Sequence, residues 1–331
     1  MRGTGAADSL QGGATQDVIL GLGGDDTLDG GDGSDFISGG AGRDELRGGD
    51  GNDLVFGGAG NDLITGGKDS RDTYPDLEPG TGNDSLFGGA GDDQVLGGRG
   101  NDFLSGGTGA DNLLGGTGVD TILGGEGNDT IYGGRPSVLF LDGADPEDGP
   151  DVLIGGAGDD DMRGGRGDDV LRGGTGNDAV RGGFGADTLC GGSGADTFAF
   201  GTRETDFFQS SQGAVDTGLG KGADVVEDFQ QGQDRIDLSA LNSFSLRFVG
   251  TGDFVYRFVG QAAFSGDGPE VRYDVVDGRT ILQLDGVEVV DTGPPGTGGS
   301  PADVVVPTDG VADAEIVLTG AFQLREGDFI L

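Results

Sequence analysis

An aspartate recurs every nine residues through most of the first 199 residues, and this repeat limits the fold more than any other feature. With the unit written G-G-x-G-x-D-x-U-x, where U is apolar, 19 rows fit. All 19 carry Asp at position six and an apolar residue at position eight, from Leu10 to Phe198. Position four is Gly in 17 of the 19 rows, with Ala6 and Thr15 as the exceptions. A period this regular predicts a solenoid built from one short unit.

Each row has room for one very short strand, such as "LVF" at 54–56. Side chains alternate across a strand, so only the residue at position eight points inward. The Gly-rich remainder must reverse the chain, and Gly at positions one, two and four permits positive φ without steric cost. Nine residues then make half a turn of a coil. We therefore predict an all-β fold, a parallel β-roll in which a two-sheet, right-handed solenoid of nonapeptide repeats encloses one layer of Leu, Ile and Val.

Two interruptions and one change of composition divide the chain. Segments 68–80 and 135–149 lengthen their rows, and the nine-residue phase resumes after each, which predicts loops on one side of a regular stack. After Ala199 glycine becomes rarer and 11 of the 18 Phe residues follow. We expect a roll over 1–199 with insert loops 68–80 and 135–149. We expect a small β-rich C-terminal cap domain over 200–331.

The predicted cap contains short apolar runs rich in Val, Phe, Tyr and Thr, separated by turn residues, which is the pattern of strands. These runs are 224–229, 235–238, 254–259, 271–276, 280–284 and 315–318. The stretch 291–303, "DTGPPGTGGSPAD", predicts a flexible loop between them.

Charge and composition exclude several classes of partner. The chain of 331 residues has 77 Gly, no His, one Cys and a formal net charge of −40. That charge argues against nucleic acid and against anionic membrane surfaces, and favours cations. No apolar run is long enough for a membrane span, and the N-terminus lacks the apolar stretch of a secretory signal peptide. Cys190 cannot form an internal disulfide and is expected to be a free surface thiol.

The predicted stack is unstable without cations. It places aspartates about 4.8 Å apart along both edges, where two carboxylates repel by roughly 3 kcal/mol at an effective dielectric constant near 20. A hard divalent cation with six to eight oxygen ligands between the loops removes this repulsion. Calcium tolerates irregular oxygen cages, magnesium requires stricter geometry, and zinc prefers His or Cys. The rows accommodate roughly 12 to 16 calcium ions, and their positive charge is of the same order as the formal −40.

The candidate calcium ligands are the position-six aspartates of the third row onward. They are Asp26, Asp35, Asp44, Asp53, Asp62, Asp84, Asp93, Asp102, Asp111, Asp120, Asp129, Asp151, Asp160, Asp169, Asp178, Asp187 and Asp196. The alternative, that these aspartates are ordinary solvent-exposed turn residues, does not explain why their nine-residue phase is kept over 19 rows.

Rows such as "GGDGNDLVF" and "GGEGNDTIY" resemble the calcium-binding β-roll of RTX (repeats-in-toxin) proteins. The tail resembles the C-terminal region of serralysin-type secreted metalloproteases in "GGSGADTFAF", "DVVEDFQQGQDRIDLS" and "IVLTG". The final "DFIL" is similar to the C-terminal signal read by type I (ABC-transporter) export. These resemblances imply an extracellular, secreted protein whose partners are calcium ions and, during export, the type I secretion machinery.

Several assignments stay open at this point. Asp224, Asp228, Asp234 and Asp237 match the serralysin post-roll motif, and an ion-binding role is about as well supported as a plain turn or edge-strand role. The acidic stretch 142–151 is better explained as a solvated loop than as an extra ion site. For "DFIL" the alternative is a final edge strand, and both roles can hold at different times.

The sequence predicts a non-enzymatic protein. The absence of His removes Ser-His-Asp and Cys-His arrangements and the H-E-x-x-H zinc-protease motif, although spacing leaves a glycosidase-like carboxylate pair open. The first functional hypothesis is a secreted calcium-binding protein that folds on meeting calcium, with an unknown cell-surface or polysaccharide partner. The alternative is a non-protease enzyme, or an accessory module of a secreted hydrolase or polysaccharide-modifying enzyme.

Overall fold

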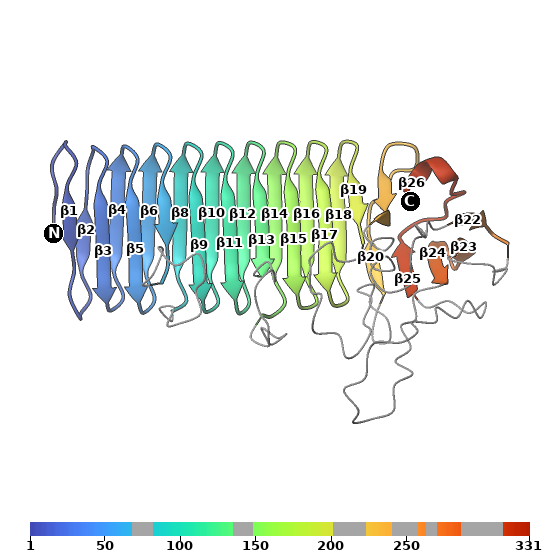
Figure 1. Cartoon of the computed structure of the whole chain (residues 1–331), viewed down its shortest axis with the longest axis horizontal. Helices are drawn as coiled ribbons and strands as arrows, with labels where there is room; N and C mark the ends of the chain where they lie inside the picture. The colour runs from blue at the N-terminus through green and yellow to red at the C-terminus, as the bar shows by residue number, and fades with distance from the viewer. Residues whose placement is uncertain (68–81, 135–147, 201–222, 240–256, 263–269, 286–313) are drawn as a thin grey trace, which may run out of the picture.

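The protein is described from a computed structural model, which covers residues 1–67, 82–134, 148–200, 223–239, 257–262, 270–285 and 314–331. Two sheets face each other and run side by side along an elongated roll, with the N-terminus at one end and the C-terminal strands at the other (Figure 1). Through β21 consecutive strands alternate between the sheets, so every second strand is a neighbour in the same sheet, whereas β22 to β25 all lie in one sheet. The prediction of an all-β parallel roll is confirmed.

Within the described residues, one sheet has 12 strands, all parallel to their neighbours. In spatial order they are β1 (Ser9–Gln11), β3 (Thr27–Asp32), β5 (Glu45–Asp50), β7 (Leu63–Thr65), β9 (Gln94–Arg99), β11 (Asn112–Thr117), β13 (Thr130–Gly134), β15 (Asp161–Arg166), β17 (Ala179–Phe184), β19 (Thr197–Ala199), β21 (Arg235–Asp237) and β26 (Phe329–Ile330).

The described part of the other sheet has 14 strands and is parallel from its first strand through β25. In spatial order they are β2 (Val18–Leu20), β4 (Phe36–Ala41), β6 (Leu54–Ala59), β8 (Ser85–Ala90), β10 (Phe103–Thr108), β12 (Thr121–Glu126), β14 (Val152–Ala157), β16 (Val170–Thr175), β18 (Thr188–Ser193), β20 (Asp224–Val226), β25 (Ala314–Leu318), β24 (Arg279–Asp285), β23 (Glu270–Val276) and β22 (Arg257–Gly260). Strand β24 is antiparallel to both β25 and β23.

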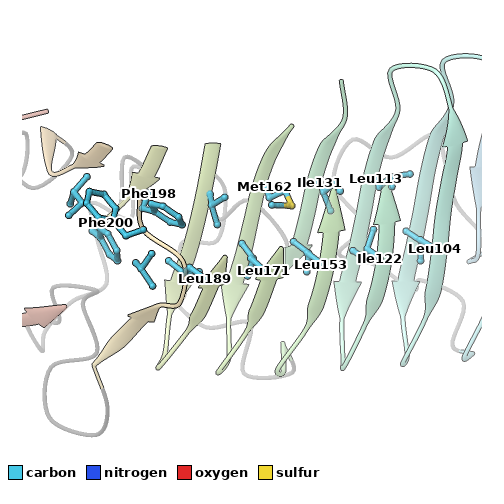
Figure 2. Packing of buried hydrophobic residues seen from close by; sticks show 14 of the residues in the cluster. Leu104, Leu113, Ile122, Ile131, Leu153, Met162, Leu171, Leu189, Phe198 and Phe200 are labelled. Atoms are coloured by element: carbon cyan, nitrogen blue, oxygen red, sulfur yellow. The ribbon is translucent and has the colours of Figure 1, made fainter. Parts of the chain in front are cut away.

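The position-eight residues form the core, as expected. From Ile19 to Phe198 each of these side chains is fully buried, and Leu10 in the first turn is partly buried against them. Figure 2 shows part of this layer between the sheets, with Leu113 and Ile131 from one sheet facing Leu104 and Ile122 from the other. The interior of the roll therefore buries one large apolar side chain per nine residues, which limits its hydrophobic stabilisation.

The strands are longer than the predicted three residues. Most span six, because the glycines at positions one and two continue the ladder into position three, as in the pairing of Gly107 with Gly125 and of Thr108 with Glu126. The glycines with positive φ are at positions two and four, for example Gly40 (φ 115°) and Gly42 (φ 138°). Position one does not need positive φ, so that part of the prediction is wrong; its glycine has another purpose, described below.

The nine-residue phase continues across both inserts. Leu54 pairs with Ser85, and Thr121 pairs with Val152, in the same register as turns without an insert. Most of the two predicted insert loops lies outside the described residues.

The predicted tail strands are confirmed where they are described. β20, β21, β23, β24 and β25 fall within or overlap the predicted runs, and β22 covers the end of run 254–259, whose first residues lie outside the described part. Loop 291–303 also lies outside it. The final strand β26 pairs with β21, so the end of "DFIL" is a strand in the folded protein. No helix among the described residues is long and apolar enough to cross a membrane.

Candidate metal centres

The 17 candidate aspartates all lie at the bends between the two sheets, directly before position seven. Each is 3% exposed or less, although none of them belongs to the apolar core. Burial of an isolated carboxylate is strongly unfavourable unless it is paired, hydrogen-bonded or bound to a cation. The environment of each carboxylate oxygen therefore decides what these bends can bind.

One oxygen of each carboxylate is satisfied by the backbone of the preceding turn on the same edge. The N–H of Asp26 donates a 2.8 Å hydrogen bond to Oδ1 of Asp44, and the N–H of Asp44 donates a 2.8 Å bond to Oδ1 of Asp62. This ladder follows one edge from Asp8 to Asp234, and a second ladder follows the other edge from Asp17 to Asp224. The ladders fix the carboxylates at one orientation per turn.

The second oxygen has no hydrogen-bond partner. Oδ2 is buried and unpartnered in 16 of the 17 candidates, with Asp84 as the exception. A row of buried carboxylate oxygens without donors is rare in proteins, where nearly all buried polar atoms are paired. Because Oδ2 has the same orientation in turn after turn along both edges, the same kind of ligand is expected at each turn.

Backbone carbonyls complete the surroundings of Oδ2. A Cβ added to Gly164, at position one, would collide with both Oδ2 of Asp169 and the carbonyl oxygen of Gly182 in the next turn. The same two kinds of atom crowd position one in most turns. Glycine at position one therefore lets a carboxylate oxygen and a carbonyl oxygen approach the same small region, without a side chain between them.

The donor set suits a hard cation. Within the described residues no cluster of three or more His, Cys, Asp or Glu side chains could hold a metal ion. A cation at these bends would accordingly be held by aspartate oxygens together with backbone carbonyls. All-oxygen sets of six to eight ligands are those of calcium, whereas zinc is held by nitrogen and sulfur. The residues present fit calcium.

The electrostatics of the bends favour a bound cation. Burial raises the pKa of Asp169 to about 9; the hydrogen bond from the N–H of Asp151 opposes this shift, and the charges of Asp187, Asp151 and Asp148 add to it. Burial raises the pKa of Asp151 to about 8 and that of Asp102 to about 7. At neutral pH Asp169 and Asp151 would therefore hold a proton unless a cation replaces it.

A second side-chain ladder at position five has the opposite direction. Oδ1 of Asn83 accepts a 2.8 Å bond from the N–H of Asn101, and Oδ1 of Asp159 accepts a 2.7 Å bond from the N–H of Asn177. Here the earlier turn supplies the acceptor, whereas at position six the later turn does. Because Asn and Asp are interchangeable at position five, this ladder needs an acceptor and no charge.

The ends of the roll differ from its middle. Oδ2 of Asp8 accepts bonds from the N–H and Oγ1 of Thr4, and Oδ2 of Asp17 accepts one from the N–H of Gly13. These oxygens are satisfied without a cation, in the two rows that lack glycine at position four. The first two turns therefore differ from the turns that hold the candidate residues.

Near the C-terminus, the aspartates whose role the sequence leaves open have different roles in the structure. Asp224 and Asp234 continue the two position-six ladders, accepting bonds from the N–H groups of Asp187 and Asp196. Asp228 does not: its carboxylate accepts bonds from the N–H groups of Gly191 (3.0 Å) and Gly192 (2.7 Å). In other turns those N–H groups bond to carbonyls of the next turn, as Gly21 does to Ser38. Asp228 thus replaces the missing carbonyls.

Asp237 lies in β21, where its Oδ1 accepts a bond from the N–H of Ser239. Cys190 is less accessible than a free surface thiol: it is half-buried, and its Sγ contacts Oδ2 of Asp228 at 3.0 Å. Burial, the bond to Asp228 and the charge of Asp228 raise the pKa of this thiol to about 12. Such a thiol is unreactive at neutral pH.

Comparison with known proteins identifies the repeats. A family model described as the RTX calcium-binding nonapeptide repeat (4 copies) matches residues 2–37, 38–70, 80–104, 105–135, 147–171 and 163–198, together more than half of the chain. No curated protein sequence matches the chain.

Two solution structures of subunits of a mannuronan C5-epimerase from Azotobacter vinelandii are similar to it. The AlgE6R2 subunit is 26% identical, with 63% of this chain and 91% of that chain covered and a TM-score of 0.25. The AlgE6R3 subunit is 25% identical, with 62% and 80% covered and a TM-score of 0.23.

Proposed function

The chain belongs to the RTX calcium-binding nonapeptide repeat family, and from this premise we propose that it is a secreted protein whose roll folds as calcium ions bind between successive turns. The 17 position-six aspartates are the proposed side-chain ligands, and carbonyls of the Gly-rich bends supply neutral oxygens. The observation that carries the proposal is the row of 16 buried Oδ2 atoms without a hydrogen-bond partner.

In this proposal calcium binding and folding are coupled, because neither the small apolar core nor the acidic bends would stabilise the fold without ions. Each turn of 18 residues buries two large apolar side chains and two carboxylates. The glycines also lose much conformational entropy when they are ordered. Ions that bind the folded bends and not the unfolded chain add their binding free energy to folding. About 12 to 16 ions would offset most of the formal charge of −40.

The proposed location is outside the cell. Where free calcium is low the chain would stay unfolded and able to pass through a transporter, and outside it would fold. In the folded protein Phe329 lies in β26 and is only 7% exposed. An export signal in this segment would therefore be accessible only before the chain folds. We also propose the division into a roll (1–199) and a serralysin-like C-terminal domain (200–331). The apolar core continues from one into the other.

Circular dichroism of the metal-free chain tests the coupling. We expect little strand signal in chelator at neutral pH and a cooperative gain on adding calcium, together with a decrease in hydrodynamic radius. Magnesium at the same concentration is the control for charge screening and is expected to have little effect. Equal strand signal in chelator and in calcium would disprove coupled folding. An equal response to magnesium would contradict the choice of ion.

A further inference from the structure

The two outer faces of the roll differ in charge. From β2 to β14 the 14-stranded sheet presents 14 side chains outward, at positions seven and nine of its seven strands, and all are Val, Leu, Ile, Phe, Ser or Thr. We call these 14 positions the apolar face. The outward positions of the 12-stranded sheet include Asp29, Glu45, Arg47, Asp161 and Arg163. In a chain with 24% charged residues, an uncharged face of seven strands needs a reason.

Phenylalanines form the centre of the apolar face. Phe36 and Phe56 have ring centroids 5.7 Å apart, Phe56 and Phe87 are stacked at 4.9 Å, and Phe87 and Phe103 are 5.6 Å apart. This ladder crosses four adjacent strands of one sheet. Val18 (54% exposed) and Leu54 (36% exposed) extend the exposed apolar surface around it. The rings pack against one another along the outside of the sheet.

We propose that the apolar face binds the same face of a second copy of this chain, in an isologous two-fold dimer. Two copies that meet here bury at most one charged residue of these seven strands, Glu126 at the end of β12. Contact through the 12-stranded face would bury several at the cost of their hydration. Strand β2 has three residues and each of the other six strands has six. At about 4.8 Å between strands and about 3.3 Å per residue, they give roughly 620 Å² per copy. That is close to the roughly 800 Å² per partner of a stable interface.

The charge of the chain sets the conditions for this contact. Two copies with a formal charge of −40 each repel one another until cations neutralise the bends. The inference therefore rests on the proposed calcium loading, since both the flat face and the lowered charge depend on it. We expect the dimer only in calcium, and we expect added salt to strengthen it by screening the remaining repulsion.

Sedimentation velocity of the full chain in calcium tests the proposal. The double variant F56S/F87S removes the stacked pair and introduces the residue that Ser38 and Ser105 already provide at position nine of β4 and β10. The matched control L96S/L114S makes a similar apolar loss at position nine of β9 and β11, two register partners on the opposite sheet. We expect a concentration-dependent dimer whose dissociation constant rises about tenfold or more in F56S/F87S and little in the control.

Circular dichroism of each sample in calcium separates folding from association. A folded wild-type chain that stays monomeric at high micromolar concentration overturns the proposal, and this includes the case in which another segment of the chain covers the face. Equal weakening by both double variants overturns it as well. Absence of calcium-dependent folding counts against the proposed function, whereas a folded monomer counts only against the dimer.

Discussion

The backbone N–H of Asp169 donates a 2.9 Å hydrogen bond to Oδ1 of Asp187, one turn further along the roll, while Oδ2 of Asp187 is buried without a hydrogen-bond partner. This pair contains both functions of position six. One oxygen holds adjacent turns in register through the backbone, and the other is left for a cation. The carboxylate cannot be replaced by an amide without losing the second function.

The metal-free roll should depend on pH in the opposite sense to the calcium-loaded roll. In the ion-free fold the pKa of Asp169 is raised to about 9 and that of Asp151 to about 8, from an ordinary 3.8. The fold therefore binds more protons than the unfolded chain between these values. The free-energy cost of ionising these carboxyls in the fold is absent below about pH 3.8, grows as the pH rises, and is complete above about pH 9.

We accordingly expect dialysed, metal-free protein to gain strand signal by circular dichroism as pH falls from about 9 to about 4. Protons compete with calcium for the same oxygens, so the calcium midpoint should increase over the same range. A metal-free signal that does not change with pH would mean that these carboxyls are ionised and solvated in the absence of calcium.

Asp169→Asn separates charge from hydrogen bonding. The amide oxygen can still accept the bond from the N–H of Asp151, but the charge is lost and an NH₂ group replaces one oxygen. We expect the calcium midpoint of folding to rise, by about tenfold for a loss near 1.4 kcal/mol, and fewer ions to be counted by mass spectrometry.

Asp168→Asn is the matched control. Asp168 is exposed, its Oδ1 accepts a bond from the N–H of Ala186, and Asn already occupies position five in other turns. We expect its midpoint to stay near that of the unchanged protein. If both variants shift equally, position six acts only through net charge.

The roll could be predicted from the sequence because its information is periodic. Asp at position six and the apolar residue at position eight set the bends and the core, and the pairing of Leu104 with Ile122 follows directly. The length of the strands was underestimated, since glycine is usually read as a break in a strand. Here the pairs such as Gly107 and Gly125 stay in the ladder.

The roles of single oxygens could not be predicted. Spacing places aspartates along an edge, but it does not tell which oxygen bonds to the backbone and which stays open. Likewise, the role of Asp228 depends on where the last repeat ends, which the spacing of the aspartates does not give. A signal was available for Asp224 and Asp234: each comes directly before a strand-like run whose second residue, Val226 or Ile236, is apolar and buried.

Gly164→Ala tests the purpose of glycine at position one. Its Cβ would collide with Oδ2 of Asp169 and with the carbonyl oxygen of Gly182, so the carboxylate would be displaced from the proposed ion position. We expect a loss of about 3 kcal/mol in calcium, measured by denaturant unfolding. Gly13→Ala is the control, because its Cβ would meet nothing closer than 3.8 Å and its stability should change by less than about 1 kcal/mol. Similar losses in both variants would show that the approach of these two oxygens is not the reason for glycine at position one.

Asp228→Ala tests how the repeats end. The carboxylate accepts the N–H groups of Gly191 and Gly192, which have no next-turn carbonyl to bond to. Two part-buried donors without acceptors should cost about 1 kcal/mol or more each. We expect the loss to appear locally, as faster hydrogen exchange of these two amides in calcium, with the amides of β10 and β12 unchanged. Asp228→Asn keeps one acceptor and should give an intermediate exchange rate. Uniform acceleration along the roll would instead mean that Asp228 contributes to global stability and is not a local end cap.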